Sequence, residues 1–500
     1  MFRMTRIISC MWRRIVKAGL LASLFVFSAC TSKTEYTNAL PKDASMVVAM
    51  ELDEMVVKAG LNTSSGDKAI GKLKSLIKGG LQGEAAQLAE RMVERPSESG
   101  LSWEDKVYLF ATPHAGALAM LAKVEDEGKL EKLMEVLAKE SIANPLREES
   151  ECRWTQVGSA ICAFNRGTFL LMQPSKGDAM SMKGMLLSLM RQQEGEGFAS
   201  LPEFAKLEAE GNDIASVVNL AAIPYEMTTR LRMGISADIR LEDIKYLLTA
   251  NFEQGKLLVK AESLIQNPRI LSFFGALEQV MTPVQGRMME LYPGNTFCWA
   301  SVNVKGKELY NMLRHNPAIR QKLDNPPLPV DVEWIFSSID GEVSVGGNPM
   351  GGNAFLLYAD VNNRDFLKTF EDLRPMLALT GGQIALDQVG HDEYLMRTYE
   401  GYYWFGVKNG KLYATNVPSM AKEAGRTFGA SMGVKPWSAQ VKENRFFATV
   451  NLNGMKQMFL DLADYANVAM PDCSHADVEL QLKDKNENLL KLLVETLEKM

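Results

Sequence analysis

LPKDASMVVAMELDEM, residues 40–55, is matched 252 positions later by YPGNTFCWASVNVKGK, residues 292–307. Aligning the two stretches places Pro41 on Pro293. Each stretch contains a short apolar run typical of a strand and continues into a more polar segment typical of a helix. We therefore predict that one strand–helix element occurs twice in the chain.

Three further matches follow in the same order. They pair residues 105–124 with 341–361, 165–175 with 408–419, and 212–221 with 444–453. The offset between partners drifts from 252 to 232, as expected if loops gain and lose residues. Chance similarity is the alternative, because short apolar strands resemble one another at low identity. The shared order favours two tandem copies of one module.

Each copy is predicted to be an α+β fold with a mainly antiparallel sheet and packed helices. Residues 245–263, KYLLTANFEQGKLLVKAES, contain two strand-like runs around Gln254-Gly255, and Asn409-Gly410 marks a second hairpin turn. Residues 127–140 and 364–377 repeat apolar side chains at helical spacing. The resulting division is a signal peptide at 1–29, a tether at 30–40, copy 1 at 41–265, a connecting helix at 266–290 and copy 2 at 291–500.

The N-terminal segment MWRRIVKAGLLASLFVFSAC, residues 11–30, predicts export and lipid attachment. Its apolar run, 18–29, is shorter than the roughly 20 residues that cross a bilayer. Basic residues precede the run, and Phe27-Ser-Ala-Cys30 resembles the bacterial lipobox, in which the cysteine is acylated and becomes the new N-terminus. A plain signal peptide with an incidental cysteine is the alternative. We expect Cys30 to anchor the chain to a membrane of the cell envelope, most simply the outer membrane, with the face undecided.

Charge and cysteine usage exclude two classes of protein. Removal of the leader leaves 50 basic against 61 acidic residues, a net charge of −11. Nucleic-acid binding relies on clustered Lys and Arg, so no nucleic-acid partner is expected. The remaining cysteines, Cys152, Cys162, Cys298 and Cys473, form no disulfide framework. A turn at Gly158 would place Cys162 opposite Thr155, so free and mostly buried thiols are expected.

Motifs for cofactors or metals are weak. GDKAIGKL, residues 66–73, imitates a phosphate loop but has Leu73 in place of Ser or Thr, which favours a helix start. DKNENLLKLLVE, residues 484–495, has calcium-loop spacing without the required Gly, which favours a terminal hairpin or helix. The four histidines lie far apart in sequence. We predict no cofactor and no metal site, and assign no catalytic residue.

One polar position recurs where apolar strands end. It is occupied by Glu51, Asn219, Asn303 and Asn451. These side chains could contact a ligand, but a local cap on the strand-to-helix turn explains all four.

Residues 36–61, 212–221 and 247–263, together with the anchor, resemble the family called domain of unknown function 4836, lipoproteins of Bacteroidota-type bacteria. The resemblance covers nearly the whole mature chain. It implies an envelope location and supplies no catalytic residue.

Two functions follow. The first is a lipid-anchored binding or scaffold protein whose partner is an envelope protein or a glycan; residues 400–407, EGYYWFGV, are the best aromatic segment for such a surface. The alternative is a hydrolase using dispersed carboxylates, with Asp360, Asp392 and Glu393 as candidates.

Overall fold

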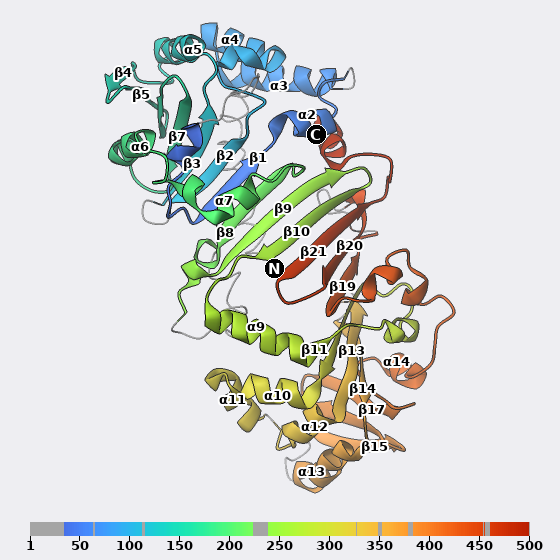
Figure 1. The fold of residues 1–500 in the computed structure, drawn as a ribbon. Helices are drawn as coiled ribbons and strands as arrows, with labels where there is room; N and C mark the ends of the chain where they lie inside the picture. The colour runs from blue at the N-terminus through green and yellow to red at the C-terminus, as the bar shows by residue number, and fades with distance from the viewer. Residues whose placement is uncertain are drawn as a thin grey trace. The chain divides into compact units, whose positions relative to one another are not determined.

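The structure is a computed structural model, shown in Figure 1. It describes residues 35–63, 66–112, 116–223, 239–326, 328–348, 353–378, 384–453, 455 and 461–499. These residues form two compact units. Unit 1 contains the described residues up to 223 together with 244–257 and 485–499, and unit 2 contains 239–243 and 258–484.

The sheet of unit 1 has the strand order β9-β8-β1-β2-β3-β7-β6-β5-β4, and every neighbouring pair is antiparallel. Its strands are β1 (Met46–Met50), β2 (Val107–Thr112), β3 (Ala117–Lys123), β4 (Arg147–Glu149), β5 (Cys152–Val157), β6 (Ala160–Phe164), β7 (Thr168–Pro174), β8 (Ile214–Asn219) and β9 (Lys245–Glu253).

The helices of unit 1 cover the apolar side chains of this sheet. They are α2 (Leu52–Lys58), α3 (Asp67–Gly80), α4 (Gly83–Glu94), α5 (Glu127–Lys139), α6 (Lys183–Met190), α7 (Pro202–Leu207) and α15 (Leu489–Lys499). Helix α5 begins where Asp126 accepts a hydrogen bond from the Lys129 N–H at 3.0 Å. Its buried face, which includes Leu130 and Met134, packs with α4 and the central strands in one core.

The sheet of unit 2 has the order β21-β20-β19-β12-β13-β14-β18-β17-β16-β15, again with antiparallel neighbours. Its strands are β12 (Cys298–Lys305), β13 (Ile339–Asn348), β14 (Ala354–Val361), β15 (Ala385–Gly390), β16 (Glu393–Thr398), β17 (Gly401–Lys408), β18 (Lys411–Thr415), β19 (Phe446–Asn451), β20 (Ala463–Met470) and β21 (His475–Leu482). The two-residue strand β11 (Met281–Thr282) pairs with β12, and β10 (Lys256–Ser263) carries the chain from unit 1 into unit 2.

Unit 2 has two hydrophobic cores on its sheet, and the helices at 332–338, 368–378 and 418–423 contribute to them. The described helices of the unit are α9 (Pro268–Val280), α10 (Gly306–Arg314), α11 (Pro317–Asp324), α12 (Val332–Ser338), α13 (Lys368–Ala378) and α14 (Pro418–Glu423). One core is aromatic and contains Tyr292, Trp299, Tyr358 and Phe447. The other lies between α13 and the strands β15 to β17. Mixed helix and antiparallel sheet in both units confirm the predicted α+β class.

The two sheets share one strand order. Strands β1, β2, β3, β7, β8 and β9 of unit 1 occupy the same relative positions as β12, β13, β14, β18, β19 and β20 of unit 2. The four sequence matches fall on these corresponding strands. Their cross-strand register agrees as well: Val47 faces Val217 in unit 1, and the aligned Trp299 faces the aligned Thr449 in unit 2.

Several local predictions are confirmed. Asn409 and Gly410 join β17 to β18 with φ of 52° and 71°, the positive values that a tight hairpin turn requires. Thr155 faces Cys162 across β5 and β6, and the four cysteines within the described ranges are free. Residues 66–73 enter α3, and residues 489–499 form α15.

The unit boundaries differ from the predicted divisions at three places. Tyr36 and Leu40 are buried, so the fold includes residues that the sequence assigns to a tether. The predicted connecting helix at 266–290 is helical over Pro268–Val280. Residues 485–499 belong to unit 1, whereas the sequence boundaries place them in copy 2.

Candidate functional site

The three carboxylates proposed for a hydrolase each have a basic partner of their own. Asp360, near the end of β14, accepts hydrogen bonds from Lys411 Nζ at 2.6 Å and from the Glu342 backbone N–H at 3.0 Å. Asp360 is therefore bound within the sheet by the neighbouring strand, since Lys411 faces it in the β14–β18 register.

Asp392 and Glu393 are adjacent in sequence but contact different partners. Asp392 Oδ2 accepts from Arg364 at 2.6 Å, while Glu393 accepts from Lys408 Nζ and from the Tyr413 hydroxyl, both at 2.8 Å. The structure thus distributes the three candidates over three separate ion pairs. Within the described ranges, no group of three or more His, Cys, Asp or Glu side chains is arranged to hold a metal ion.

The predicted lipidation site, Cys30, lies outside the described residues, as does His114. Among the helices that the structure describes, none combines the length and apolar character needed to cross a bilayer.

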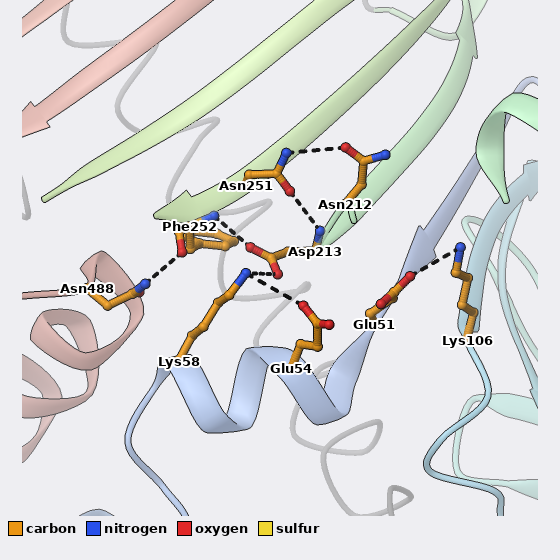
Figure 2. Close-up of polar contacts among 9 residues, drawn as sticks. All are labelled: Glu51, Glu54, Lys58, Lys106, Asn212, Asp213, Asn251, Phe252 and Asn488. Carbon is orange, nitrogen blue, oxygen red and sulfur yellow. Dashed lines mark hydrogen bonds and ion pairs between the residues drawn. The ribbon is translucent and has the colours of Figure 1, made fainter. Parts of the chain in front are cut away.

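A buried carboxylate in unit 1, Asp213, lies just before β8 (Figure 2). Its side chain is 0% exposed; Oδ1 accepts from Lys58 Nζ at 2.5 Å and Oδ2 accepts from the Phe252 N–H at 2.7 Å. Asn251 Oδ1 accepts from the Asp213 N–H at 3.1 Å. Both carboxylate oxygens are satisfied, so this cluster joins α2 to the ends of β8 and β9 and has a structural role.

The same cluster fixes the C-terminal segment in unit 1. Asn488 Nδ2 donates to the Phe252 carbonyl at 2.7 Å, as Figure 2 shows, and the Gly255 N–H donates to the Glu487 carbonyl at 2.8 Å. Gly255 has φ of +77°, and a Cβ there would lie 2.6 Å from the Lys485 carbonyl oxygen, so only glycine fits. These bonds explain why residues 485–499 cluster with unit 1.

Unit 2 contains a pocket of about 90 Å³ beside β19 and β20. Part of its lining is apolar, from Met432, Pro436 and Trp437, and part is polar, including Thr449 and Tyr465. The lining combines an apolar wall with a few polar groups, in a volume well below the roughly 300–1,000 Å³ of drug-sized ligand sites.

Three buried polar atoms without hydrogen-bond partners among the described residues lie in one cross-strand row, of which Thr449 alone lines the pocket. Trp299 on β12 faces Thr449 on β19, which in turn faces Asn467 on β20. The three residues are 1%, 2% and 2% exposed, and Trp299 Nε1, Thr449 Oγ1 and Asn467 Oδ1 lack a partner among the described residues. Seven such atoms occur in the described part of the chain, so this row holds nearly half of them. Buried polar groups are normally paired, so the concentration marks the row as a candidate site.

Aromatic packing holds the row rigid. The Trp437 ring stacks on Phe447 with centroids 5.6 Å apart and on Trp299 at 6.3 Å. Gly346 completes the row on β13, where a Cβ would lie 2.7 Å from the Tyr292 ring. The aromatic core behind Trp437, which lines the pocket, is therefore closely packed and leaves no room for a larger residue at position 346.

The polar groups around the mouth satisfy one another. Asn451 Oδ1 accepts from the Asn453 N–H at 2.9 Å, and the Asn453 side chain donates to Asp464. Burial, with a smaller effect of Glu479 and Asp464, raises the pKa of Tyr465 to about 12, so its hydroxyl is neutral at physiological pH. Thr449 Oγ1 is thus, among the described residues of the lining, the polar atom that is both buried and unpartnered.

The corresponding row in unit 1 is entirely apolar. Phe110, Val47, Val217 and Leu247 face one another across β2, β1, β8 and β9, at 0%, 0%, 4% and 8% exposure. The same strand order therefore carries an apolar row in one unit and, in the other, a row with buried polar groups that reaches the pocket at Thr449.

Two of the four recurring polar residues are local caps, as the sequence predicts. Asn219 accepts from the Ala222 N–H at 3.0 Å, and Asn451 caps the following turn. The prediction is wrong for the other two: Asn303 Nδ2 donates to the Pro283 carbonyl at 2.9 Å, and Glu51 makes an ion pair with Lys106 at 3.3 Å.

Sequence reasoning missed Thr449, Asn467 and Trp437. One signal was available, because aligning 212–221 with 444–453 places Thr449 on Val217, a polar residue at a core position. The aromatic segment 400–407 does not line this pocket; Tyr402 is 57% exposed and its ring lies 6.2 Å from that of Trp404.

The chain belongs to the family described as domain of unknown function (DUF4836), whose model matches residues 36–490. This confirms the family resemblance drawn from the sequence. No curated protein matches the chain.

Solved structures of TP0453 resemble the chain distantly. Crystal form IV has a TM-score of 0.28 and 10% identity, covering 48% of this chain and 84% of that one. Crystal form III has a TM-score of 0.28 and 10% identity, covering 50% of this chain and 89% of that one.

Proposed function

We propose that this protein is a lipid-anchored binding protein of the cell envelope and that its ligand site is the pocket of unit 2. The observation that carries the proposal is the pocket beside β19 and β20, whose lining includes Thr449, one of three residues in a buried row with an unpartnered polar atom among the described residues. Leaving a buried polar group unpaired costs about 1–3 kcal/mol. The apolar row of unit 1 is the stable alternative on the same strand order, so the polar row is explained by binding.

We further propose that the two units are copies of one module. The shared strand order supports this, as does the agreement between sequence alignment and register at Val47–Val217 and Trp299–Thr449. In such a duplication, one copy can keep an apolar core while the other acquires a ligand site. This is compatible with a binding protein, because the same fold can carry different sites.

Attachment through acyl chains on Cys30 completes the proposal. Two or three chains, with about 0.8 kcal/mol for each buried CH₂, would hold the protein stably at a membrane. A Cys30→Ala variant is expected in the soluble fraction after cell lysis. If that variant remains membrane-bound, the anchor is elsewhere.

The binding proposal is tested by thermal shift with envelope fractions and a panel of uncharged small solutes. The wild-type protein should be stabilised by at least one of them, and a Thr449→Val/Asn467→Leu variant should lose that response. Thr112→Val is the matched control, because Thr112 Oγ1 in unit 1 is also buried without a partner among the residues described. A response equal in all three proteins, or absent from wild type, contradicts the proposal.

A further inference from the structure

We propose that the face of the unit 2 sheet opposite the pocket binds the acyl chains of a phospholipid. The inference goes beyond the proposed function, because it concerns a second surface. Thr449 lines the pocket, whereas its neighbours Ala448 and Val450 on β19 point to the other side of the sheet. We call that side the open face.

The open face is apolar across six strands. Residues that face one another across β14, β13, β12, β19, β20 and β21 form two rows of six, and a third row ends at β20. The rows are Phe355–Gly347–Cys298–Val450–Ala466–Leu480, Leu357–Val345–Ala300–Ala448–Val468–Val478 and Ala359–Val343–Val302–Phe446–Met470. An antiparallel sheet with one solvated face normally carries polar residues on that face. The open face departs from this pattern.

The apolar residues of the open face are incompletely covered. Apart from Ala359, every member of the three rows is at least partly exposed, and Val345 and Val478 in the central row are 42% and 37% exposed. Among the described residues, neither core of unit 2 includes a member of the rows. In unit 1, Leu109 has the strand position of Val345 and packs against the core that contains α5. A position that a helix covers in unit 1 is therefore open in unit 2.

Helix α9 adds exposed apolar side chains at the margin of the open face. Arg445, which precedes Phe446 at the start of β19, donates from Nη1 to the Glu278 carbonyl in the last turn of α9 at 2.8 Å. Leu271 and Phe273 of α9 are 48% and 43% exposed. They lie within about 10 Å of Glu278 along the helix axis. Exposed apolar side chains thus occur on the open face and on the helix that borders it.

The chemistry of the open face fits hydrocarbon better than a protein partner. The thiol of Cys298 donates to the Gly347 carbonyl at 3.4 Å, and the other side chains of the rows carry no hydrogen-bonding group. Protein interfaces are held by Tyr, Trp and Arg near their centre, with about one hydrogen bond per 100–200 Å². The three rows contain none of these residue types. A ligand that needs only apolar contacts is therefore favoured.

The dimensions of the open face also favour lipid over a second copy of the chain. Strands about 4.8 Å apart and rows about 6.8 Å apart give a footprint of about 24 Å by about 14 Å. This is well below the roughly 800 Å² that each partner contributes to a stable protein interface. It is longer than the roughly 15 Å that an acyl chain occupies in one leaflet of a bilayer. Its width of three rows leaves room for two chains side by side, as a phospholipid has.

The proposal is tested by lipid transfer to the mature chain carrying Cys30→Ala, so that the protein bears no acyl chain of its own. The probe is pyrene-labelled phosphatidylcholine in phosphatidylcholine vesicles. Uptake is measured as loss of pyrene excimer fluorescence and as co-elution of the labelled lipid with the protein in gel filtration. Uptake should be saturable. Glycerophosphocholine, which has the headgroup without acyl chains, should not compete.

Substitutions on the open face should impair this uptake. Val345→Lys/Val478→Lys should weaken it about tenfold or more, because a charge buried against hydrocarbon is costly. Val389→Lys is the matched control, since Val389 is 52% exposed on β15 of the same unit and lies outside the three rows; it should leave uptake unchanged. Val345→Thr/Val478→Thr keeps the β-branched shape and should weaken uptake by a smaller factor. This milder variant tests the proposal if circular dichroism shows that the Lys variant does not fold.

Three results would each overturn the proposal. They are absence of uptake, equal uptake by the folded variants of the open face, and competition by glycerophosphocholine. A dimer that Val345→Lys/Val478→Lys converts to a monomer, without lipid uptake, would show instead that the open face binds a second copy. None of the substituted residues lines the pocket, so failure here is separate from failure of the proposed function.

Discussion

The same cross-strand row is apolar in unit 1 and polar in unit 2. Val47, Val217 and Leu247 seal the first sheet, while Trp299, Thr449 and Asn467 occupy the same strand positions in the second. Both rows are buried to a similar extent, so exposure does not distinguish them. The difference is chemical: the first row has no polar side-chain atom, whereas the second has three that lack a partner among the described residues.

Burial of polar groups alone is therefore not a mark of function in this protein. Asp213 is as buried as Thr449, but its two oxygens are both bonded, by Lys58 and by the Phe252 N–H. A buried polar cluster whose atoms all have hydrogen-bond partners stabilises one arrangement of the chain. A cluster with unpaired atoms can still form hydrogen bonds to another molecule.

The largest effect is expected from breaking the satisfied cluster. Asp213→Ala removes the partner of Lys58 and leaves the Phe252 N–H unpaired, which should lower the free energy of unfolding by about 3 kcal/mol. Urea denaturation monitored by circular dichroism measures this. Glu54→Ala is the control, since Glu54 lies 3.7 Å from the same Lys58 Nζ with its side chain half exposed, and should change stability by about 0.5 kcal/mol or less. If the two substitutions lower the free energy of unfolding equally, Asp213 does not have the structural role proposed for it.

Introducing a hydroxyl into the sealed row should have the next largest effect. Val217→Thr keeps the shape of the side chain but buries an oxygen between Val47 and Leu247, and should destabilise the protein by about 2 kcal/mol. Thermal unfolding without ligand checks the value. An unchanged midpoint would mean that unit 1 also accommodates a polar row, and the contrast between the units would be lost.

The reverse change in unit 2 should stabilise the protein. Thr449→Val removes an unpartnered hydroxyl at nearly constant volume and should raise the free energy of unfolding by about 1 kcal/mol while impairing ligand response. Stability and binding are measured on the same preparation. If Thr449→Val destabilises, then its hydroxyl is already satisfied and the row is an ordinary core.

The smallest expected effect is on the pH dependence of stability. It concerns a second position at which the two units differ. Alignment of 105–124 with 341–361 places the buried Glu342 of unit 2 on Lys106 of unit 1. Burial raises the pKa of Glu342, with Ser301 and the Arg287 N–H opposing this by bonding its carboxylate at 2.9 and 3.1 Å. The folded state therefore holds the proton more tightly than the unfolded chain does.

Stability contributed by this proton is fully present below the ordinary carboxyl pKa and is lost as pH rises through the raised value. Glu342→Gln mimics the protonated acid, because its amide can donate to Ser301 while its oxygen accepts from Arg287 N–H. Urea midpoints of wild type and variant should coincide in acid and diverge toward neutral pH, with the variant more stable. A variant less stable at neutral pH would show that the ionised carboxylate is favoured.

Much of the fold could be predicted from the sequence, because strand patterns and turns are local. The Asn409-Gly410 hairpin follows from the conformational freedom of its residues, and the register that places Thr155 opposite Cys162 follows from a two-residue turn. The pocket could not be predicted in the same way. Thr449 is a β-branched residue in a strand, which is ordinary, and its significance appears only when its neighbours on β12 and β20 are known.

The position of the C-terminal segment was also beyond local reasoning. Residues 484–495 predict a terminal hairpin or helix, and α15 is observed at Leu489–Lys499. Its membership of unit 1 depends on bonds such as Asn488 to the Phe252 carbonyl, between residues 236 positions apart. Sequence order alone would assign these residues to unit 2, which precedes them directly in the chain. Long-range hydrogen bonds place them in unit 1 instead.

The return of residues 485–499 to unit 1 has a consequence for biosynthesis. The backbone of Gly255 is paired by Glu487, so the unit synthesised first is the last to be completed. During synthesis these bonds of the N-terminal half stay unformed until residues 485–499 have been made. A chain cut short by a premature stop codon would therefore damage the half of the protein farthest from the lesion in sequence, so that only complete chains acquire a finished first unit.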